Sequence, residues 1–211
     1  MVDPVQIELS RIGKRFKHWI FRDINLLFHP STFYGIVGHN GIGKSTLLRI
    51  ISGYTSPTIG EVSYSDGRGK MDMQRAATNL SFAAPYIDLI EELTVREMIS
   101  FHLSFKKVFS QLTDLESILH EIELFAHQDT LVGDLSSGLM QRLKVGLMII
   151  TETPVLLLDE PTSYLDLKGK SWYHRLIEKY RPGRLVIVAS NDPEDLVRVD
   201  HFVEMEQFVP T

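Results

Sequence analysis

The residues with the clearest chemical pattern lie at positions 38–46, which read GHNGIGKST. Their glycines, lysine and serine have the spacing G-x-x-x-x-G-K-[ST]. Glycine allows a tight backbone turn that brings successive N–H groups close to a phosphate. A lysine at this place reaches the β- and γ-phosphates of a nucleotide, and the serine hydroxyl can ligate Mg²⁺. The pattern therefore predicts a site for ATP with Mg²⁺. The whole loop is predicted to form it: Gly38, His39, Asn40, Gly41, Ile42, Gly43, Lys44, Ser45 and Thr46.

A second chemical feature is the pair Asp159 and Glu160, which directly follows the apolar run Val155–Leu158. Ligands bind outside the carboxyl ends of parallel strands, so such a strand would present both carboxylates to the same phosphates. Asp159 is placed to hold Mg²⁺ through the water shell of the ion, and Ser45 is the other predicted metal-binding residue. Glu160 lies one position onward and would polarise the attacking water as a general base, with Lys44 also in a catalytic role.

Each pattern also has a simpler explanation. Positions 38–46 are compatible with a glycine-rich turn that carries an exposed lysine, and positions 159–162 with a polar turn. The surroundings favour the phosphate site, because an apolar strand at Phe33–Val37 precedes the loop and an amphipathic helix at Lys44–Ser52 follows it. Beside such a loop, the acidic pair is better explained as part of the same site.

The rest of the chain supplies the alternation of strands and helices that would position these residues. Apolar runs such as Leu185–Val188 are typical of parallel strands covered on both faces. Thr94 with Glu97 forms a capping box at a helix start. The alternation predicts an α/β fold with a mainly parallel sheet, beside which residues from about 87 to 132 form a helical subdomain. Strands are predicted at Gln6–Ile12, Phe33–Val37, Glu61–Tyr64, Leu80–Ala83, Val155–Leu158, Leu185–Ala189 and Phe202–Met205. Helices are predicted at Lys44–Ser52, Val95–Phe105, Asp114–Glu123, Ser137–Thr151 and Lys170–Tyr180.

The combination of three motifs resembles a known family. LSSGLMQR at 135–142 precedes DEPT at 159–162, which is followed by SYLD at 163–166. With GHNGIGKST upstream, this order resembles the ATPase subunits of ABC transporters from about Ile7 to Met205. The resemblance implies a P-loop NTPase fold with a mainly parallel sheet, a small antiparallel β part and a helical subdomain. It also implies one ABC-type ATPase domain at 1–211, with a core at 1–86 and 133–211 and the helical subdomain at about 87–132.

The resemblance implies roles for residues outside the loop. Phe16 stands where an aromatic ring stacks on adenine, with Trp19 as the alternative, and either ring could instead belong to the core. Ser136 and Gly138 would contact the γ-phosphate held by a second subunit, either a copy of this chain or a paralogue, so that two chains enclose two ATP molecules. Asp166 would belong to the turn that communicates between the two sites. Ser136 is also well suited to cap a helix N-terminus, and the two roles are compatible.

Three places depart from the family pattern. Ser137 and Leu139 stand in a signature that usually reads LSGGQ. Pro85 stands where a glutamine contacts Mg²⁺ and the transmembrane partner. Asn191 replaces a histidine that clamps the γ-phosphate; its amide can donate a hydrogen bond but cannot become cationic. Removing one hydrogen-bond donor to the charge of a transition state raises the activation free energy by about 2.7–4 kcal/mol. Replacing a cationic donor by a neutral one should raise it by less. Because Glu160 is present, we expect slow hydrolysis, with Asn191 as a further catalytic residue.

Composition limits the possible functions. The 211 residues are 44% apolar and 23% charged, as in an ordinary globular protein, and contain no cysteine for disulfides or thiolate metal sites. The net charge of −5 argues against a nucleic-acid partner, and no apolar run is long enough to span a bilayer. The resemblance implies a cytoplasmic protein held at the inner face of the cell membrane by a separate transmembrane permease subunit. Two alternatives are a degenerate, poorly hydrolysing ATP-binding subunit and a soluble, non-transport ABC regulatory protein.

Overall fold

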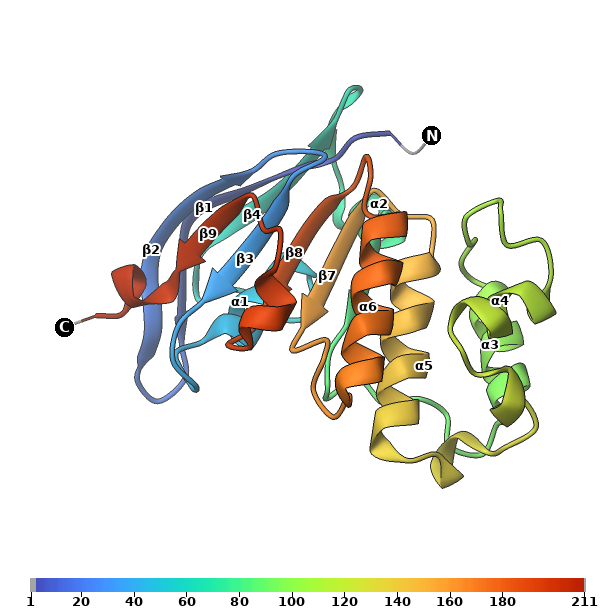
Figure 1. Ribbon diagram of the computed structural model, residues 1–211. Coiled ribbons are helices and arrows are strands. Elements are labelled where there is room, and N and C mark those ends of the chain that lie inside the picture. Colours follow the sequence, from blue (N-terminus) through green and yellow to red (C-terminus); the bar gives the residue numbers. More distant parts are fainter. Residues whose placement is uncertain (1–2, 211) are drawn as a thin grey trace. The chain divides into compact units, whose positions relative to one another are not determined.

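The computed structural model describes residues 3–210, which form two compact units (Figure 1). One unit contains the chain up to Phe82, Thr153–Glu160 and the chain from Arg181 onward. The other contains Ala83–Glu152 and Pro161–Tyr180 and is largely helical. Residues 87–132 lie within this helical unit, which also includes two later helices. The assignment of the chain as one ABC-type domain with a helical subdomain at 87–132 stays a prediction.

The first unit has an antiparallel sheet in the strand order β2-β1-β4-β5. Its alternating burial follows the sequence pattern, since Ile7 and Leu9 on β1 point into the core between polar neighbours. The sheet is the small antiparallel part that the resemblance implies. Its strands are β1 (Gln6–Arg15), β2 (Trp19–Phe28), β4 (Ile59–Asp66) and β5 (Gly69–Met71).

A bulge explains why the sequence pattern does not predict strand β2. Arg11 on β1 and Asp23 on β2 have positive φ angles of 51° and 57°, and the register of the two strands shifts nearby. The backbone N–H of Arg11 donates to Oδ1 of Asn25 at 2.9 Å, which holds the bulge together. An extra residue moves the following side chains to the opposite face of the sheet, so the alternation of apolar and polar residues is lost.

A second sheet, in the order β6-β7-β8-β3-β9, positions the residues of chemical interest. The pairs β3–β8, β3–β9 and β7–β8 are parallel, which confirms the predicted mainly parallel sheet. All residues of β7 and β8 are buried, as their continuous apolar sequences indicate. Because these strands run in one direction, the residues that follow Val37, Asp159 and Ala189 lie at the same edge of the sheet. The strands are β3 (Phe33–Val37), β6 (Leu80–Ala83), β7 (Val155–Asp159), β8 (Leu185–Ala189) and β9 (His201–Glu204).

Helix α1 (Lys44–Ile51) follows β3 and packs in an apolar core that it shares with both sheets. Its Leu47, Leu48 and Ile51 are fully buried there. The loop between β3 and α1 is therefore anchored at both of its ends by buried elements. This unit also contains the short helix α2 (Met73–Thr78) and the 3₁₀ helices η3 (Pro193–Leu196) and η4 (Met205–Phe208).

The helical unit confirms the predicted capping box. Oγ1 of Thr94 accepts from the backbone N–H of Glu97 at 3.3 Å, and Oε2 of Glu97 accepts from the backbone N–H of Thr94 at 2.8 Å. Several predicted helix and strand boundaries were wrong by one to three residues. Among the helices, the one predicted to end at Phe105 ends at Leu103, the one predicted to end at Glu123 ends at Glu121, and the one predicted to begin at Lys170 begins at Leu167. The helices are α3 (Val95–Leu103), α4 (Leu115–Glu121), η1 (Phe125–His127), η2 (Val132–Asp134), α5 (Ser137–Ile150) and α6 (Leu167–Tyr180).

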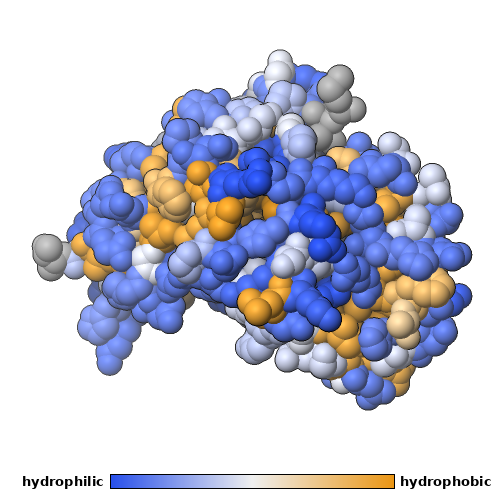
Figure 2. All heavy atoms as spheres, in the orientation of Figure 1, coloured by the Kyte–Doolittle hydropathy of each residue, from blue (hydrophilic) through white to orange (hydrophobic). Residues whose placement is uncertain are grey.

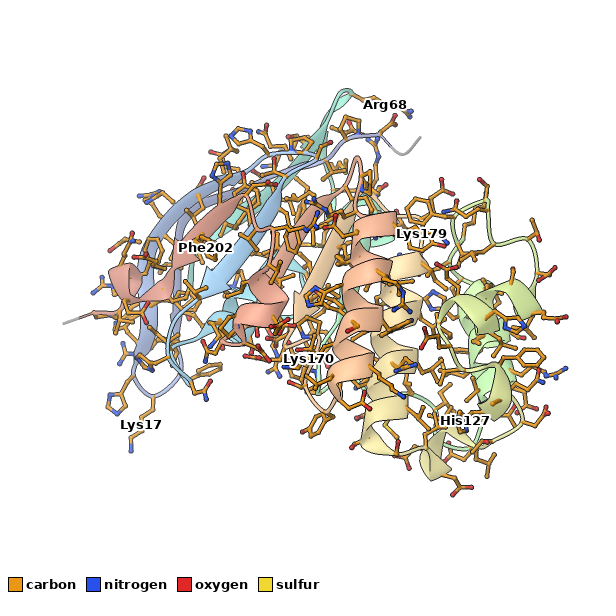
Figure 3. All side chains as sticks on the ribbon, in the orientation of Figure 1. Lys17, Arg68, His127, Lys170, Lys179 and Phe202 are labelled. Carbon is orange, nitrogen blue, oxygen red and sulfur yellow. The ribbon has the colours of Figure 1, made fainter. Side chains whose placement is uncertain are left out.

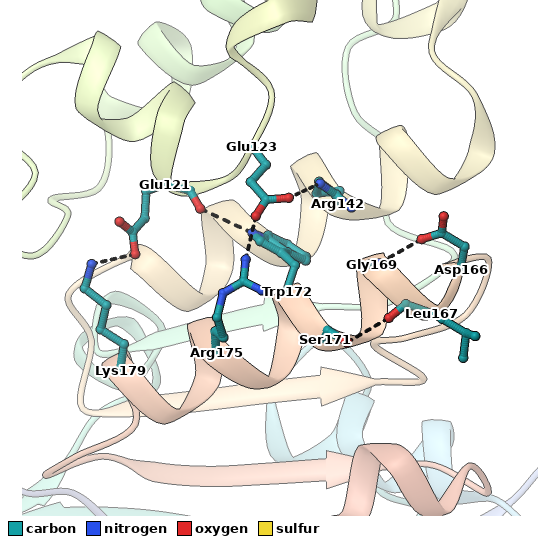
Figure 4. A network of polar contacts seen from close by, with 10 residues as sticks. All are labelled: Glu121, Glu123, Arg142, Asp166, Leu167, Gly169, Ser171, Trp172, Arg175 and Lys179. Atoms are coloured by element: carbon teal, nitrogen blue, oxygen red, sulfur yellow. Dashed lines mark hydrogen bonds and ion pairs between the residues drawn. The ribbon is translucent and has the colours of Figure 1, made fainter.

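Ion pairs connect the end of α4 to α5 and α6 (Figure 4). Glu123 accepts from Nη1 of Arg142 at 2.6 Å and from Nη2 of Arg175 at 2.5 Å. Nε1 of the buried Trp172 donates to the carbonyl oxygen of Glu121 at 3.2 Å. Partly exposed ion pairs contribute only about 0–1 kcal/mol each, so the buried indole contributes most of the stabilisation at this junction.

The face of the molecule seen in Figure 2 is mostly hydrophilic, with apolar side chains in separate patches. Within residues 3–210, no helix has the length and apolar character that crossing a membrane requires.

Candidate nucleotide-binding site

The loop after β3 has the backbone geometry of a phosphate cradle. Gly38, Gly41 and Gly43 have φ angles of 143°, 82° and 113°, a region that favours glycine. A Cβ atom on Gly43 would lie 2.6 Å from Cγ2 of Ile20, so this turn also needs glycine for space. A Cβ atom on Gly41 would meet no atom within 4 Å, which shows that this part of the loop faces open space. The described loop is thus closed against β2 on one side and open on the other.

Lys44 crosses this loop. It is the first residue of α1 and is only 6% exposed, and its Nζ donates to the carbonyl oxygen of Gly38 at 2.8 Å. The helix has no side-chain cap at its N-terminus, so its first N–H groups point toward the loop, where they can bind an anion. A cationic side chain and backbone donors therefore meet in one cradle.

Ser45 and Asp159 come together from two elements. Oγ of Ser45, in the first turn of α1, donates to Oδ1 of Asp159 at 3.0 Å, and Asp159 at the end of β7 is 1% exposed. Mg²⁺ prefers oxygen ligands and is usually held by one or two protein groups together with substrate phosphates. A hydroxyl and a carboxylate at hydrogen-bond distance, beside a phosphate cradle, fit this ion.

Glu160 follows directly and has an unusual backbone. Its φ angle is 46°, in the left-handed region that a residue with a side chain rarely adopts, and its N–H donates to the carbonyl oxygen of Ala189 at 2.8 Å. Oε2 of Glu160 accepts from Oγ of Ser190 at 2.9 Å. The structure therefore fixes both the backbone and the carboxylate of this residue.

Asn191, at the position where the resemblance implies a histidine, contacts the loop. Asn191 follows β8, and its Nδ2 donates to Oδ1 of Asn40 at 2.6 Å. His39, which precedes Asn40 in the loop, is exposed, and its Nδ1 lies 2.9 Å from the carbonyl oxygen of Asn40. Ile42 is buried and Thr46 is half-buried in α1. The predicted residues at positions 38–46 thus lie in the loop after β3 and in the first turn of α1, at the edge of the second sheet.

The two candidate adenine-stacking rings differ in accessibility. Phe16 lies in the turn between β1 and β2 and is 66% exposed, with Nζ of Lys14 at 5.1 Å from its ring centre. Trp19 is half-buried and has the guanidinium of Arg22 at 4.6 Å from its ring centre. Figure 3 shows Lys17, next to Phe16, at the end of this hairpin and pointing away from the sheets. Phe16 has the more available ring face.

The remaining predicted residues meet in the helical unit. Ser136 caps α5, because its Oγ accepts from the N–H of Leu139 at 3.4 Å, which confirms its capping role. A Cβ atom on Gly138 would lie 2.9 Å from the carbonyl oxygen of Tyr164, so glycine permits this close approach. Oδ1 of Asp166 accepts from the N–H of Gly169 at 2.7 Å. A cavity of about 330 Å³ is lined by Ser136, Ser137, Gly138, Leu139, Arg142, Tyr164, Leu165 and Asp166.

Pro85 lies in the helical unit and has no side-chain donor. It is exposed, and its carbonyl oxygen accepts from Nζ of the buried Lys144 at 3.2 Å. Burial lowers the pKa of Lys144, and the Asp88 carboxylate opposes that shift.

Three residues of the two sites are not found by sequence reasoning. Ser190 and the buried Asp195 contact each other beside Glu160, and Arg142 lines the cavity of the helical unit. For Ser190 a signal exists, because it follows an apolar strand at the same sheet edge as Glu160. Asp195 lies in a short 3₁₀ helix that no sequence pattern marks.

Comparison with known proteins identifies relatives along most of the chain. A family model described as "ABC transporter" matches residues 21–163. The chain is 30% identical over 172 residues to rat "ATP-binding cassette sub-family A member 7", which covers 81% of this chain and 8% of that protein. It is 28% identical to "Nod factor export ATP-binding protein I" of Rhizobium leguminosarum bv. viciae, over 94% of this chain and 65% of that protein. It is also 28% identical to "Cytochrome c biogenesis ATP-binding export protein CcmA" of Haemophilus influenzae, over 90% and 91% of the two chains. The chain thus spans only a small part of the first relative and about two thirds of the second.

Solved structures show the same fold. A putative ABC transporter ATP-binding protein from Pyrococcus furiosus superposes with a TM-score of 0.79 at 20% identity, over 97% of this chain and 100% of that one. The dimeric ATP-binding cassette MJ0796, in a post-hydrolysis state bound to ADP and Pi, superposes with a TM-score of 0.80 at 24% identity, over 94% and 93% of the two chains. With the match over residues 21–163, these likenesses establish that the chain belongs to the ABC transporter family and has the fold of its ATP-binding cassettes.

Proposed function

We propose that this chain binds ATP·Mg²⁺ and hydrolyses it slowly as the ATPase subunit of an ABC transporter. One observation carries the proposal. Three groups lie at the same edge of the second sheet: the Lys44 side chain across the loop, the oxygens of Ser45 and Asp159, and the Glu160 carboxylate. This edge thus combines a cation that can bind phosphates, oxygen ligands for a metal ion and a carboxylate that can accept a proton from water.

Each residue has a distinct part in the proposed reaction. The backbone N–H groups of the loop and Nζ of Lys44 bind the β- and γ-phosphates, and the Phe16 ring stacks on the adenine. Ser45 and Asp159 would hold Mg²⁺, which would supply positive charge next to the terminal phosphates. Glu160 orients the attacking water and accepts its proton as general base. No protein group forms a covalent intermediate.

Slow turnover follows from Asn191. The family's histidine would offer a cationic donor to the γ-phosphate, whereas the Asn191 amide is neutral and already donates to Asn40 at 2.6 Å. An amide that must leave this partner gives weaker stabilisation of transition-state charge than a free cationic donor. The same contact favours the alternative of a degenerate, ATP-binding subunit that hydrolyses poorly.

The proposed assembly is a dimer that encloses two ATP molecules. Ser136 and Gly138 at the start of α5 would contact the γ-phosphate bound by the second subunit, and Asp166 would lie in the turn between the sites. The dimeric state of the MJ0796 cassette supports this arrangement. A separate transmembrane permease is the proposed second partner, which would hold the chain at the inner face of the membrane.

A binding and turnover experiment tests the proposal. We expect wild-type protein with Mg²⁺ to bind ATP saturably by calorimetry and to release phosphate. Lys44→Ala should weaken binding about 10- to 100-fold, since hydrogen bonds to charged groups contribute about 1.5–3 kcal/mol. Glu160→Gln should bind ATP normally but stop turnover. A matched control is Lys168→Ala, because that lysine is exposed on α6.

Two results would contradict the proposal. Absence of saturable ATP binding in millimolar Mg²⁺ would remove the nucleotide site altogether. Native turnover by Glu160→Gln would show that another group is the base. Intact binding with no turnover in the wild type would select the degenerate alternative.

A further inference from the structure

The end of β8 places a hydroxyl against the proposed general base. Ser190 directly follows β8 and is fully buried. Its Oγ lies 2.9 Å from Oε2 of Glu160. The two residues are neighbours because Asp159 and Ala189 are partners in the parallel register of β7 and β8. The contact is therefore built by two strands of the core.

The hydroxyl of Ser190 is itself anchored. Its oxygen accepts from the backbone N–H of Asp192 at 3.0 Å, and it lies 2.9 Å from Oε2 of Glu160 and 2.6 Å from Oδ2 of Asp195. A serine hydroxyl has one hydrogen, so these two carboxylate oxygens share it as acceptors of a three-centre hydrogen bond. Asp195 is 2% exposed, in the 3₁₀ helix after β8. A hydroxyl with this many fixed neighbours has little freedom to move.

The backbone of Glu160 is held as firmly as its side chain. Its φ angle of 46° is energetically unfavourable for a residue with a Cβ atom. The hydrogen bond from its N–H to the carbonyl oxygen of Ala189 maintains this conformation. Such strain persists only where the surroundings impose it, and it clusters at functional sites. The backbone therefore fixes the direction in which the Glu160 side chain leaves the chain. Ser190 fixes one of the two carboxylate oxygens at the tip of that side chain.

We propose that Ser190 is a positioning residue for ATP hydrolysis: it holds one carboxylate oxygen of Glu160 so that the other faces the attacking water. The inference rests on the proposed function of this site. Ser190 contacts no phosphate and accepts no proton from water in this role. A competing explanation is that Ser190 only stabilises the buried end of β8.

The conservative pair Ser190→Ala and Ser190→Thr separates these explanations. Loss of the hydroxyl should lower kcat about 10- to 100-fold, because a base displaced by about 1 Å loses up to a hundredfold in rate. The KM for ATP should stay unchanged, since the phosphate loop is intact. Ser190→Thr should restore most of the rate, because threonine retains the hydroxyl. Thermal unfolding of both variants measures any loss of stability.

A double-mutant cycle and a crystal structure complete the test. Glu160→Asp keeps a carboxylate but withdraws it by one methylene from Ser190, so its lowered rate stays measurable. Combining Ser190→Ala with Glu160→Asp should lower that rate no further than Glu160→Asp alone, since the serine acts through the glutamate. Without nucleotide, crystals of Ser190→Ala should show the Glu160 carboxylate displaced or disordered relative to the wild type, which is a readout independent of activity.

Three outcomes would overturn the inference. These are native kcat in Ser190→Ala, a further loss of rate in the Glu160→Asp background, and a loss of rate and stability together that threonine does not restore. They are distinct from failure of the proposed function, which appears as native turnover in Glu160→Gln or no turnover in the wild type. If the wild type shows no turnover, the comparison of the wild-type and Ser190→Ala crystal structures decides whether Ser190 fixes the Glu160 carboxylate.

Discussion

Asn191 shows how much of this site depends on single side chains. Its Nδ2 donates to Oδ1 of Asn40 at 2.6 Å, so the amide is bound to the phosphate loop. A histidine at this place could carry a positive charge, whereas an amide remains neutral at every pH. The rate of the chemical step should therefore respond to the residue at position 191 more than the binding of ATP does.

We predict that Asn191→His raises kcat for ATP hydrolysis. The imidazole adds a donor that can become cationic next to transition-state charge, for which mutagenesis elsewhere indicates up to about a hundred- to a thousandfold. We expect a gain nearer to tenfold, because Asn191 already provides a neutral donor. Steady-state phosphate release measures kcat, with Asn191→Ala as the control that removes the donor and should be slower than the wild type. An unchanged or lower kcat in Asn191→His would contradict this account.

The residues of the site differ in how far the sequence predicts them. The loop at 38–46 and the pair Asp159–Glu160 are contiguous, so their spacing is sufficient to locate them. The Ser190–Glu160 contact depends instead on the register of β7 and β8, which pairs Asp159 with Ala189. A sequence shows which strands exist but not which neighbour each one has, and this contact therefore becomes visible only in the structure.

At the scale of elements, backbone geometry limits prediction most. Continuous apolar runs locate β3, β7 and β8, because a strand buried on both faces has no other simple pattern. The bulge at Arg11 and Asp23 hides β2, and β5 with only three residues is too short for a periodic signal. The antiparallel sheet is thus predicted less completely than the parallel one.

A matched pair of glycines tests the backbone of this antiparallel sheet. Gly60 on β4 and Gly69 on β5 have φ angles of 85° and 117°. A Cβ atom on Gly60 would lie 2.4 Å from the carbonyl oxygen of Arg11, whereas one on Gly69 would meet no atom within 4 Å. We predict that Gly69→Ala lowers the free energy of unfolding by about 1–2 kcal/mol through backbone strain alone. Gly60→Ala should cost at least about 1 kcal/mol more, because β1 must shift.

Urea unfolding followed by the fluorescence of Trp19 measures both glycine variants, since this residue lies on β2 in the same sheet. Trp172→Phe in each background removes the second indole, so the signal reports this sheet. Equal losses for the two alanine variants would show that the close approach to Arg11 has no energetic consequence.

At the scale of the whole molecule, acid sensitivity follows from a histidine in the helical unit. Nε2 of His102 lies 2.8 Å from Oγ1 of Thr151, and that hydroxyl donates to the carbonyl oxygen of Leu147 at 2.6 Å. Because the hydroxyl hydrogen is used, the ring nitrogen is the donor. Burial, and then the positive charge of Lys106, lowers the pKa of His102 from 6.5 to about 4. The folded protein therefore holds this ring neutral at a pH where the unfolded chain protonates it.

We predict that this histidine makes the free energy of unfolding fall as the pH decreases from about 6.5 to about 4. Between these values the unfolded chain binds more protons than the folded one, so stability rises with pH and the contribution is fully present only above 6.5. His102→Gln keeps an N–H donor for Thr151 but cannot become charged, and it should show a shallower loss of stability on acidification.

Urea unfolding at several pH values in a Trp19→Phe background, followed by the fluorescence of Trp172, measures this loss in the helical unit. His18→Gln, a change at an exposed position, should leave the dependence unaltered. Parallel curves for the wild type and His102→Gln would show that other groups cause the acid sensitivity.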